Sequence, residues 1–193
     1  IREKLAFTKG TIEDSVEHLI KYPDIIEHTI LSTCNRVEIY ARAKNQDSGI
    51  ELIKKFICDF HGLSSIELED HFYSYRDKEA VEHLFRVSSS LDSMVLGEAQ
   101  ILGQVKEAYS LAKNLSSTGL ILNQLFEKAF SIAKKVRDET GIAERSVSIS
   151  SAAVELAQKI FNDLEKHTVM LVGTGEMAEL AAKHLISYGV KTV

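Results

Sequence analysis

The first 45 residues carry one helical pattern followed by two strand patterns. Over 11–21, apolar residues recur at helical spacing behind Thr11, a candidate N-cap, so we predict a helix there. Runs of β-branched and apolar residues over 26–33 and 37–43 predict two short strands. The polar residues between these runs include an asparagine, which favours turns. The pattern therefore predicts a helix and then two strands joined at a bend.

The next patterns continue this alternation. Ser48-x-x-Glu51 has the spacing of a capping box and predicts the start of a helix with an apolar inner face. An aromatic strand is expected over 72–75, with Asp77 as the cap of the helix that follows. Strands that alternate with helices indicate a small α+β or α/β sandwich, in which one sheet has helices packed on a face.

Small and polar residues replace this pattern from Ser88 onward. Two glycines and two glutamines fall within the eight residues 97–104. They are poor material for an isolated helix, because each glycine costs about 1 kcal/mol relative to alanine. Two readings remain open: close packing of the backbone against a neighbouring element, or a polar wall that binds a ligand.

Two long helical patterns follow, over 120–140 with Gly141 at the end, and over 146–161. The first contains a basic cluster, made up of Lys128, Lys134, Lys135 and Arg137. Acidic residues are interspersed with these cations, so a solvated helix face explains the cluster more simply than an RNA contact.

A strand, a glycine-rich turn and a helix close the sequence. The apolar run 168–172 predicts a strand covered on both faces, and 190–193 the start of another. The turn between the strand and the helix has the pattern Gly-x-Gly-x-x-Ala, made up of Gly173, Thr174, Gly175, Glu176, Met177 and Ala178. Such a turn brings backbone N–H groups and a helix N-terminus to a pyrophosphate, so we predict a dinucleotide-binding fold. Residues that distinguish NAD from NADP would follow the second strand.

Composition limits the class of protein. The 193 residues are 45% hydrophobic and 26% charged, as in ordinary globular chains, and the net charge of -5 argues against a broadly basic nucleic-acid surface. The sequence has two cysteines, no signal-like leader and no apolar run of the roughly 20 residues that a membrane helix needs. We expect a cytoplasmic protein with free thiols, no membrane association and no metal site. The absence of an initiator methionine and the final strand-like residues suggest a fragment.

The bend after the first strand holds the candidate nucleophile. Cys34 is followed by the turn former Asn35 and the cation Arg36, a setting that favours the thiolate. The alternative is that Cys34 only packs, as free cysteines in apolar segments usually do. Cys58 lies within a predicted helix and is expected to be inert. A thiolate in one domain and a dinucleotide fold in the next suggest reductase chemistry through a thioester.

Several segments in order resemble the glutamyl-tRNA reductase family. They are Ser32-Thr33-Cys34-Asn35-Arg36-x-Glu38-x-Tyr40, His83 to Val87, Leu91 to Lys106, Lys135 to Thr140, Ser146 to Ser148 and Gly173-x-Gly175-Glu176. The resemblance implies an oxidoreductase of tetrapyrrole (porphyrin and heme) biosynthesis that converts glutamyl-tRNA into glutamate-1-semialdehyde with NADPH. It also implies a catalytic domain over 1–145 and the start of a Rossmann-type NADPH domain over 146–193. A homodimer formed by a later domain and glutamate-1-semialdehyde aminomutase as product acceptor are the further partners that it implies.

The resemblance assigns roles to individual residues. Cys34 is implied as the nucleophile and His83 as the group that assists thiol deprotonation or protonates the leaving group. The glutamyl site comprises Thr33, Cys34, Asn35, Arg36, Ser93, Glu98, Ala99, Gln100 and Gln104, and the cofactor turn comprises Gly173 to Ala178. Arg36 is suited to binding a substrate carboxylate through its planar fork. Relatives begin with an additional first strand and several have proline at position 99.

Two other functions remain open from the sequence. One is a thioester-forming reductase of a different activated acyl group, such as an acyl phosphate. The other is a non-catalytic, dinucleotide-responsive module in which Cys34 only packs.

Overall fold

The computed structural model describes residues 2–8, 10–33, 35–93, 96–98, 100–142, 149–173 and 176–193. Its elements are α1 (Arg2–Leu5), α2 (Ile12–Ile20), β1 (Ile25–Ser32), β2 (Val37–Ala43), α3 (Gln46–His61), α4 (Ser65–Leu68), η1 (Glu69–His71), α5 (Asp77–Ser88), α6 (Gln100–Asn114), α7 (Leu120–Thr140), α8 (Ile149–Phe161), η2 (Leu164–Lys166) and α9 (Glu176–Ser187). Among these residues no helix is long and apolar enough to cross a membrane.

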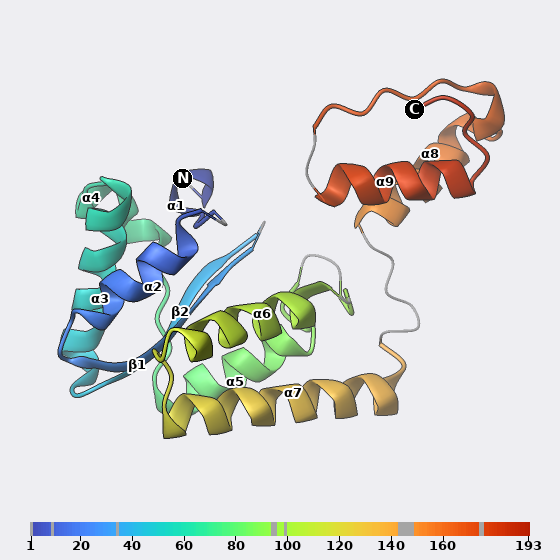
Figure 1. The fold of residues 1–193 in the computed structure, drawn as a ribbon. Helices are drawn as coiled ribbons and strands as arrows, with labels where there is room; N and C mark the ends of the chain where they lie inside the picture. Colours follow the sequence, from blue (N-terminus) through green and yellow to red (C-terminus); the bar gives the residue numbers. More distant parts are fainter. Residues whose placement is uncertain are drawn as a thin grey trace.

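A two-stranded antiparallel hairpin lies between two layers of helices (Figure 1). Ile30 packs into a core with α2 and α3, whereas Leu31 packs into a second core with α5, α6 and α7. Successive side chains of a strand point to opposite faces, which explains why nearly every residue of β1 is buried. Helices therefore cover both faces of β1, where the sequence pattern had predicted one.

Residue pairing in the hairpin determines which side chains of β2 face α5–α7. Glu38 lies opposite Leu31 and Tyr40 opposite Thr29. Because Leu31 and Tyr40 belong to the core with α5, α6 and α7, Glu38 projects into the same layer. The polar side chains of β2 are thus presented to the helix that carries His83.

The predicted helices and strands of the first 90 residues are confirmed, with three local corrections. The capping box at Ser48 is wrong, because α3 begins earlier and the Asn45 side chain accepts a hydrogen bond from the Ser48 N–H at 3.1 Å. Residue Arg76, not Asp77, is the N-cap of α5. The strand over 72–75 is absent: these residues have no ladder partner, and together with β2 they line a cavity of about 450 Å³.

A distant carboxylate caps the long helix α7. Gly119 precedes the helix and has no side chain to offer, while Glu27 of β1 accepts hydrogen bonds from the N–H groups of Gly119 at 3.0 Å and Leu122 at 2.7 Å. At the other end Gly141 closes α7 with φ +62°, as predicted. The interaction between Glu27 and α7 fixes the helix against the hairpin.

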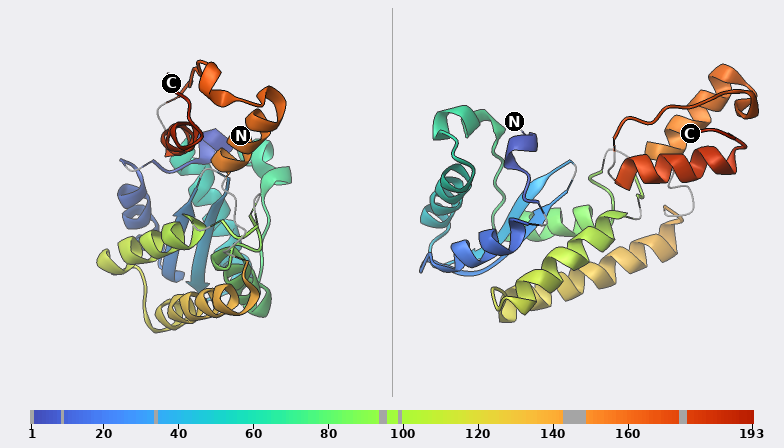
Figure 2. Two further views of the ribbon diagram at one scale, coloured as in Figure 1. Left: turned by 90° about the vertical axis from the view of Figure 1, so that its right-hand side faces the viewer. Right: turned by 45° about the horizontal axis from the view of Figure 1, so that its top comes forward.

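The α8–α9 unit lies beyond the C-terminal end of α7 (Figures 1 and 2). Its small core contains Val154, Leu164, Leu185 and Val190. The two strands predicted at 168–172 and 190–193 are reduced to one parallel bridge between Thr168 and Thr192. Met170 and Val172 are 83% and 88% exposed, so the expected burial on both faces is wrong for the described residues. A parallel strand is buried only when further strands and helices cover it.

Candidate functional site

The turn between β1 and β2 is shaped by Thr33. Its backbone N–H donates to the carbonyl oxygen of Arg36 at 2.9 Å, and its Oγ1 accepts from the N–H groups of Arg36 at 3.0 Å and Asn35 at 3.2 Å. A hydroxyl that binds backbone N–H groups two or three residues on stabilises a tight turn. Asn35 is exposed, and Cys34, the predicted nucleophile, lies outside the described residues.

Glu38 is the centre of a polar cluster on the face of the hairpin that packs against α5, α6 and α7. Its Oε1 lies 3.0 Å from Arg36 Nη1, 2.5 Å from the Tyr73 hydroxyl and 2.9 Å from His83 Nε2. Its Oε2 accepts a hydrogen bond from the hydroxyl of Tyr40. The Glu38 side chain is only 5% exposed. One buried carboxylate therefore joins the turn, β2, the segment before α5 and α5 itself.

These contacts keep Glu38 ionised. Burial by itself raises the pKa of this carboxyl group, but the hydrogen bonds from His83, Tyr40 and Tyr73 outweigh burial and lower the pKa from 4.5 to about 2. Burial and the charge of Glu38 together raise the pKa of both tyrosine hydroxyls well above its usual value, so both remain donors.

Arg36 is bound by the protein's own acceptors. Besides Glu38, its guanidinium contacts the Asp92 carboxylate at 2.9 Å and donates to the Asp92 carbonyl oxygen. Burial alone lowers the pKa of Arg36, but the hydrogen bond to Asp92 and the charge of Glu38 outweigh it and raise the pKa. The Arg36 side chain is nearly buried, whereas that of Asp92 is 43% exposed. Asp92 is thus the more accessible partner of the pair.

His83 lies between these two acidic groups. Its Nε2 contacts Glu38, and its Nδ1 lies 4.0 Å from the carboxylate of Asp92. The ring of Tyr75 packs against the imidazole with 4.7 Å between centroids, and that of Tyr73 lies 5.7 Å away. The structure thereby connects two predicted site residues, Arg36 and His83, through Glu38 and Asp92.

The loop that carries Asp92 is closed on itself. Ser90 accepts a hydrogen bond from the Gly97 N–H at 3.1 Å, and its hydroxyl donates to the Glu98 carbonyl oxygen at 2.6 Å. Gly97 has φ +83°, and a side chain there would collide with the carbonyl oxygen of Ile142. Gly97 therefore allows close packing of the backbone, which is the first of the two interpretations given for residues 97–104.

The predicted polar wall is spread over this loop and the start of α6. Ser93 and Glu98 are half-buried in the loop, and Gln100 and Gln104 are half-buried on one face of α6, four residues apart. Ala99 lies outside the described residues. The assignment of these residues to a glutamyl site stays a prediction.

The polar cluster borders the 450 Å³ cavity beside β2. Glu38, Tyr73 and His83 line it together with apolar side chains from α1, α3, α5 and α7, among them Ile53, Leu122 and Leu125. A cavity of this size with a mostly apolar wall and a few convergent polar groups is typical of a small-molecule site.

Sequence reasoning did not assign roles to five members of the cluster, which are Glu38, Tyr40, Tyr73, Tyr75 and Asp92. A signal was present for two of them. Glu38 and Tyr40 alternate with the apolar residues Val37, Ile39 and Ala41 of the strand, which places both on one face. The other three come from distant segments that only the fold brings to this place.

The predicted cofactor turn is described in part. Gly173 has φ +136°, a conformation that side-chain-bearing residues rarely adopt, and open space surrounds the position of a Cβ. Residues 174 and 175 lie outside the described part, and α9 begins at Glu176 and continues through Met177 and Ala178. A glycine with a positive φ three residues before a helix N-terminus is compatible with the predicted phosphate-binding turn.

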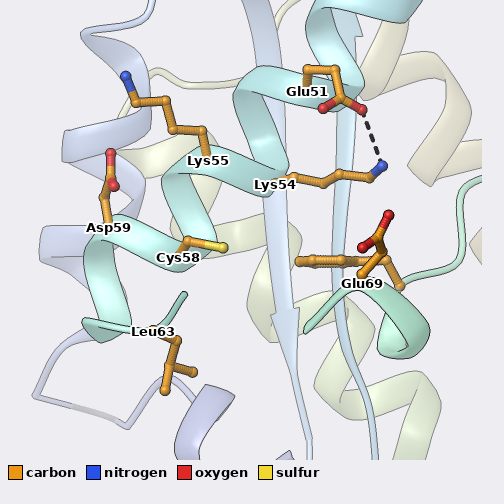
Figure 3. A pocket seen from close by; sticks show the side chains of 8 residues that line it. Glu51, Lys54, Lys55, Cys58, Asp59, Leu63 and Glu69 are labelled. Atoms are coloured by element: carbon orange, nitrogen blue, oxygen red, sulfur yellow. Dashed lines mark hydrogen bonds and ion pairs between the residues drawn. The ribbon is translucent and has the colours of Figure 1, made fainter. Parts of the chain in front are cut away.

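The second cysteine lines a different cavity, of about 520 Å³, beside α3 (Figure 3). Cys58 is buried, and burial raises the pKa of its thiol. Lys54 at the edge of this cavity is paired with Glu51 at 3.0 Å. A protonated, buried thiol fits the expectation that Cys58 is unreactive.

Comparison with known proteins identifies two family matches. The family described as "Glutamyl-tRNAGlu reductase, N-terminal domain" matches residues 1–140, and the family described as "Shikimate / quinate 5-dehydrogenase" matches residues 155–193. The second match coincides with the predicted dinucleotide-binding unit.

Individual relatives are similar over the whole chain. Glutamyl-tRNA reductases from Geotalea uraniireducens and Geobacter sulfurreducens are 54% and 52% identical over 193 residues, all of this chain and 44% of each relative. The solved structure of glutamyl-tRNA reductase from Methanopyrus kandleri matches with a TM-score of 0.66 and 39% sequence identity. The match covers 98% of this chain and 43% of the Methanopyrus kandleri chain. The chain thus spans less than half the length of the relatives that it matches.

Proposed function

The chain belongs to the glutamyl-tRNA reductase family, and from this premise we propose that it is the catalytic part of an NADPH-dependent reductase of glutamyl-tRNA. The product is glutamate-1-semialdehyde, in the first step of five-carbon tetrapyrrole biosynthesis. The observation that supports this best is the joining of the 33–36 turn to His83 through a buried, ionised Glu38. The activity is proposed for the whole protein, of which this chain is less than half.

Cys34 is the proposed nucleophile. Its thiolate attacks the carbonyl carbon of the glutamyl ester, a C–S bond forms, and the C–O bond to the terminal ribose of the tRNA breaks. His83 takes the thiol proton and returns it to the departing ribose oxygen. The result is a glutamyl thioester on Cys34 and a free tRNA 3′ end.

The residues from Gly173 to Ala178 would hold the nucleotide. Gly173, with a φ of +136°, and the N-terminus of α9 are suited to a close approach of its phosphates. NADPH held there would supply a hydride, the reductant that a thioester on Cys34 needs to give the aldehyde and the free thiolate.

Arg36 is the proposed anchor for the substrate's side-chain carboxylate. In the structure its guanidinium is occupied by Glu38, which is buried, and Asp92, which is half-exposed. The substrate carboxylate therefore has to replace Asp92, since removing Glu38 would leave the cluster without its central acceptor. Thr33, Asn35, Ser93, Glu98, Ala99, Gln100 and Gln104 complete the proposed glutamyl site.

The remaining proposals concern organisation. The catalytic domain comprises 1–145 and the NADPH domain begins at 146. The full-length protein is cytoplasmic, forms a homodimer through a later domain and passes its product to glutamate-1-semialdehyde aminomutase.

Substrate choice distinguishes this function from its alternatives. The full-length enzyme is given NADPH with either glutamyl-tRNA or glutamyl phosphate, and uncharged tRNA is the control. NADPH oxidation that occurs with glutamyl-tRNA but not with glutamyl phosphate or uncharged tRNA supports the proposal. Faster NADPH oxidation with glutamyl phosphate than with glutamyl-tRNA indicates a reductase of another acyl donor. If neither substrate supports oxidation but the protein still binds the nucleotide, the result indicates a non-catalytic module.

A further inference from the structure

The two ring nitrogens of His83 have different surroundings. Nε2 lies 2.9 Å from Glu38 Oε1, and Nδ1 faces Asp92 at 4.0 Å, beyond hydrogen-bond distance. Glu38 is ionised at neutral pH because its pKa is about 2, so it has no proton to donate. Nε2 must therefore carry the proton of the neutral ring, which leaves the lone pair on Nδ1.

The segment between η1 and α5 contributes two aromatic side chains to this arrangement. Tyr73 donates to the same Glu38 oxygen as His83, and Tyr75 packs against the imidazole with an interplanar angle of 35°. The two tyrosine rings also contact each other, with 5.6 Å between centroids. Both rings contact the imidazole, so positions 73 and 75 place their side chains on the side of His83.

We infer that His83 acts through Nδ1, and that Tyr73 and Tyr75 are positioning residues that hold it in this state. Tyr73 acts through its hydroxyl, which fixes the carboxylate of Glu38 and reduces the charge that this carboxylate presents to the imidazole. Tyr75 acts through its ring, which limits rotation of the imidazole. The role in a reaction rests on the proposed function, whereas the tautomer and the contacts belong to this chain alone.

The surroundings of the ring give the direction of the effect. Among the described residues, the acidic groups within ion-pair distance of the imidazole are Glu38 and Asp92, and Arg36 partly neutralises both. Removal of the Tyr73 hydroxyl takes one donor from Glu38. The carboxylate then attracts a protonated imidazole more strongly, and His83 gains its proton at a higher pH.

Nuclear magnetic resonance of the ¹⁵N-histidine-labelled chain tests the tautomer and the Tyr73 contact directly. His83 signals are assigned by their loss in His83→Ala. We expect long-range spectra in which Nδ1 is unprotonated, and a titration midpoint that rises by up to about one pH unit in Tyr73→Phe. Tyr109→Phe is the matched control, because it removes a hydroxyl that donates to Asn123 in the α6–α7 layer. A protonated Nδ1, or equal midpoints in the two variants, overturns the inference.

Kinetics of the full-length enzyme test the roles of ring and hydroxyl separately. In Tyr73→Phe the acidic limb of the kcat/KM profile moves to higher pH. In Tyr75→Leu kcat falls about tenfold with KM unchanged, and Tyr75→Phe restores it because the ring is retained. Loss of activity in Tyr75→Phe as large as in Tyr75→Leu contradicts the positioning role. If the parent enzyme does not reduce glutamyl-tRNA, the proposed function fails while the spectroscopic test still decides this inference.

Discussion

Replacement of Glu38 by glutamine tests the electrostatics of the cluster. The pKa of Glu38 is about 2 in the folded protein against an ordinary 4.5, so its ionised form stabilises the fold by about 3 kcal/mol at pH 7. The folded-state pKa is depressed, and this contribution is therefore complete above pH 4.5 and is lost as the pH falls through 2. At pH 3 about 1.4 kcal/mol remains. Glutamine cannot titrate and places an amide donor among four donors.

Urea unfolding followed by circular dichroism measures this difference. We expect Glu38→Gln to lower the free energy of unfolding by up to about 3 kcal/mol at pH 7 and by about 2 kcal/mol less at pH 3. Glu17→Gln is the control, because Glu17 is exposed on α2. The reasoning would be refuted if Glu38→Gln lowered the free energy of unfolding by the same amount at pH 7 and at pH 3. Such a result would mean that the charge of Glu38 contributes nothing.

Three further substitutions or reactions test other parts of the structure. Glu27→Ala removes a buried acceptor of three backbone N–H groups at the start of α7, including that of Leu122, and should lower the free energy of unfolding by about 3 kcal/mol in the same urea assay. Gly97→Ala should destabilise the chain by about 2 kcal/mol or more, because φ is +83° and the new Cβ meets the Ile142 carbonyl oxygen; a thermal midpoint equal to that of the parent would contradict this. Cys58 should react with iodoacetamide at neutral pH far more slowly than free cysteine, since it is buried and its pKa is raised, and mass spectrometry of the modified peptide reports the rate.

The elements with a strong period could be predicted from the sequence. The helices of 12–20 and 120–140 and the two strands of the hairpin all follow patterns of apolar residues that local chemistry supports. The strands predicted at 72–75 and 168–172 failed, because strand formation depends on a neighbouring edge that the local sequence does not contain. Apolar or aromatic composition alone cannot report whether that edge is present.

Some residues of the candidate site could likewise be predicted from the sequence, and others could not. His83 and Arg36 were predicted as site residues from family motifs, and a period of two in β2 places Glu38 and Tyr40 on one face. The contact between Arg36 and Asp92 joins residues that are 56 positions apart, and no local pattern predicts such a pair. The cap of α7 by Glu27 is hidden for the same reason, since the carboxylate and the helix are more than 90 residues apart.

The central claim is that Cys34 forms a glutamyl thioester. The most direct measurement incubates full-length enzyme with radiolabelled glutamyl-tRNA in the absence of NADPH, quenches with acid and counts the label on the protein. We expect label on the parent that hydroxylamine releases, equal label on Cys58→Ser and none on Cys34→Ser. Label that persists in Cys34→Ser, or its absence from an active parent enzyme, would contradict the account.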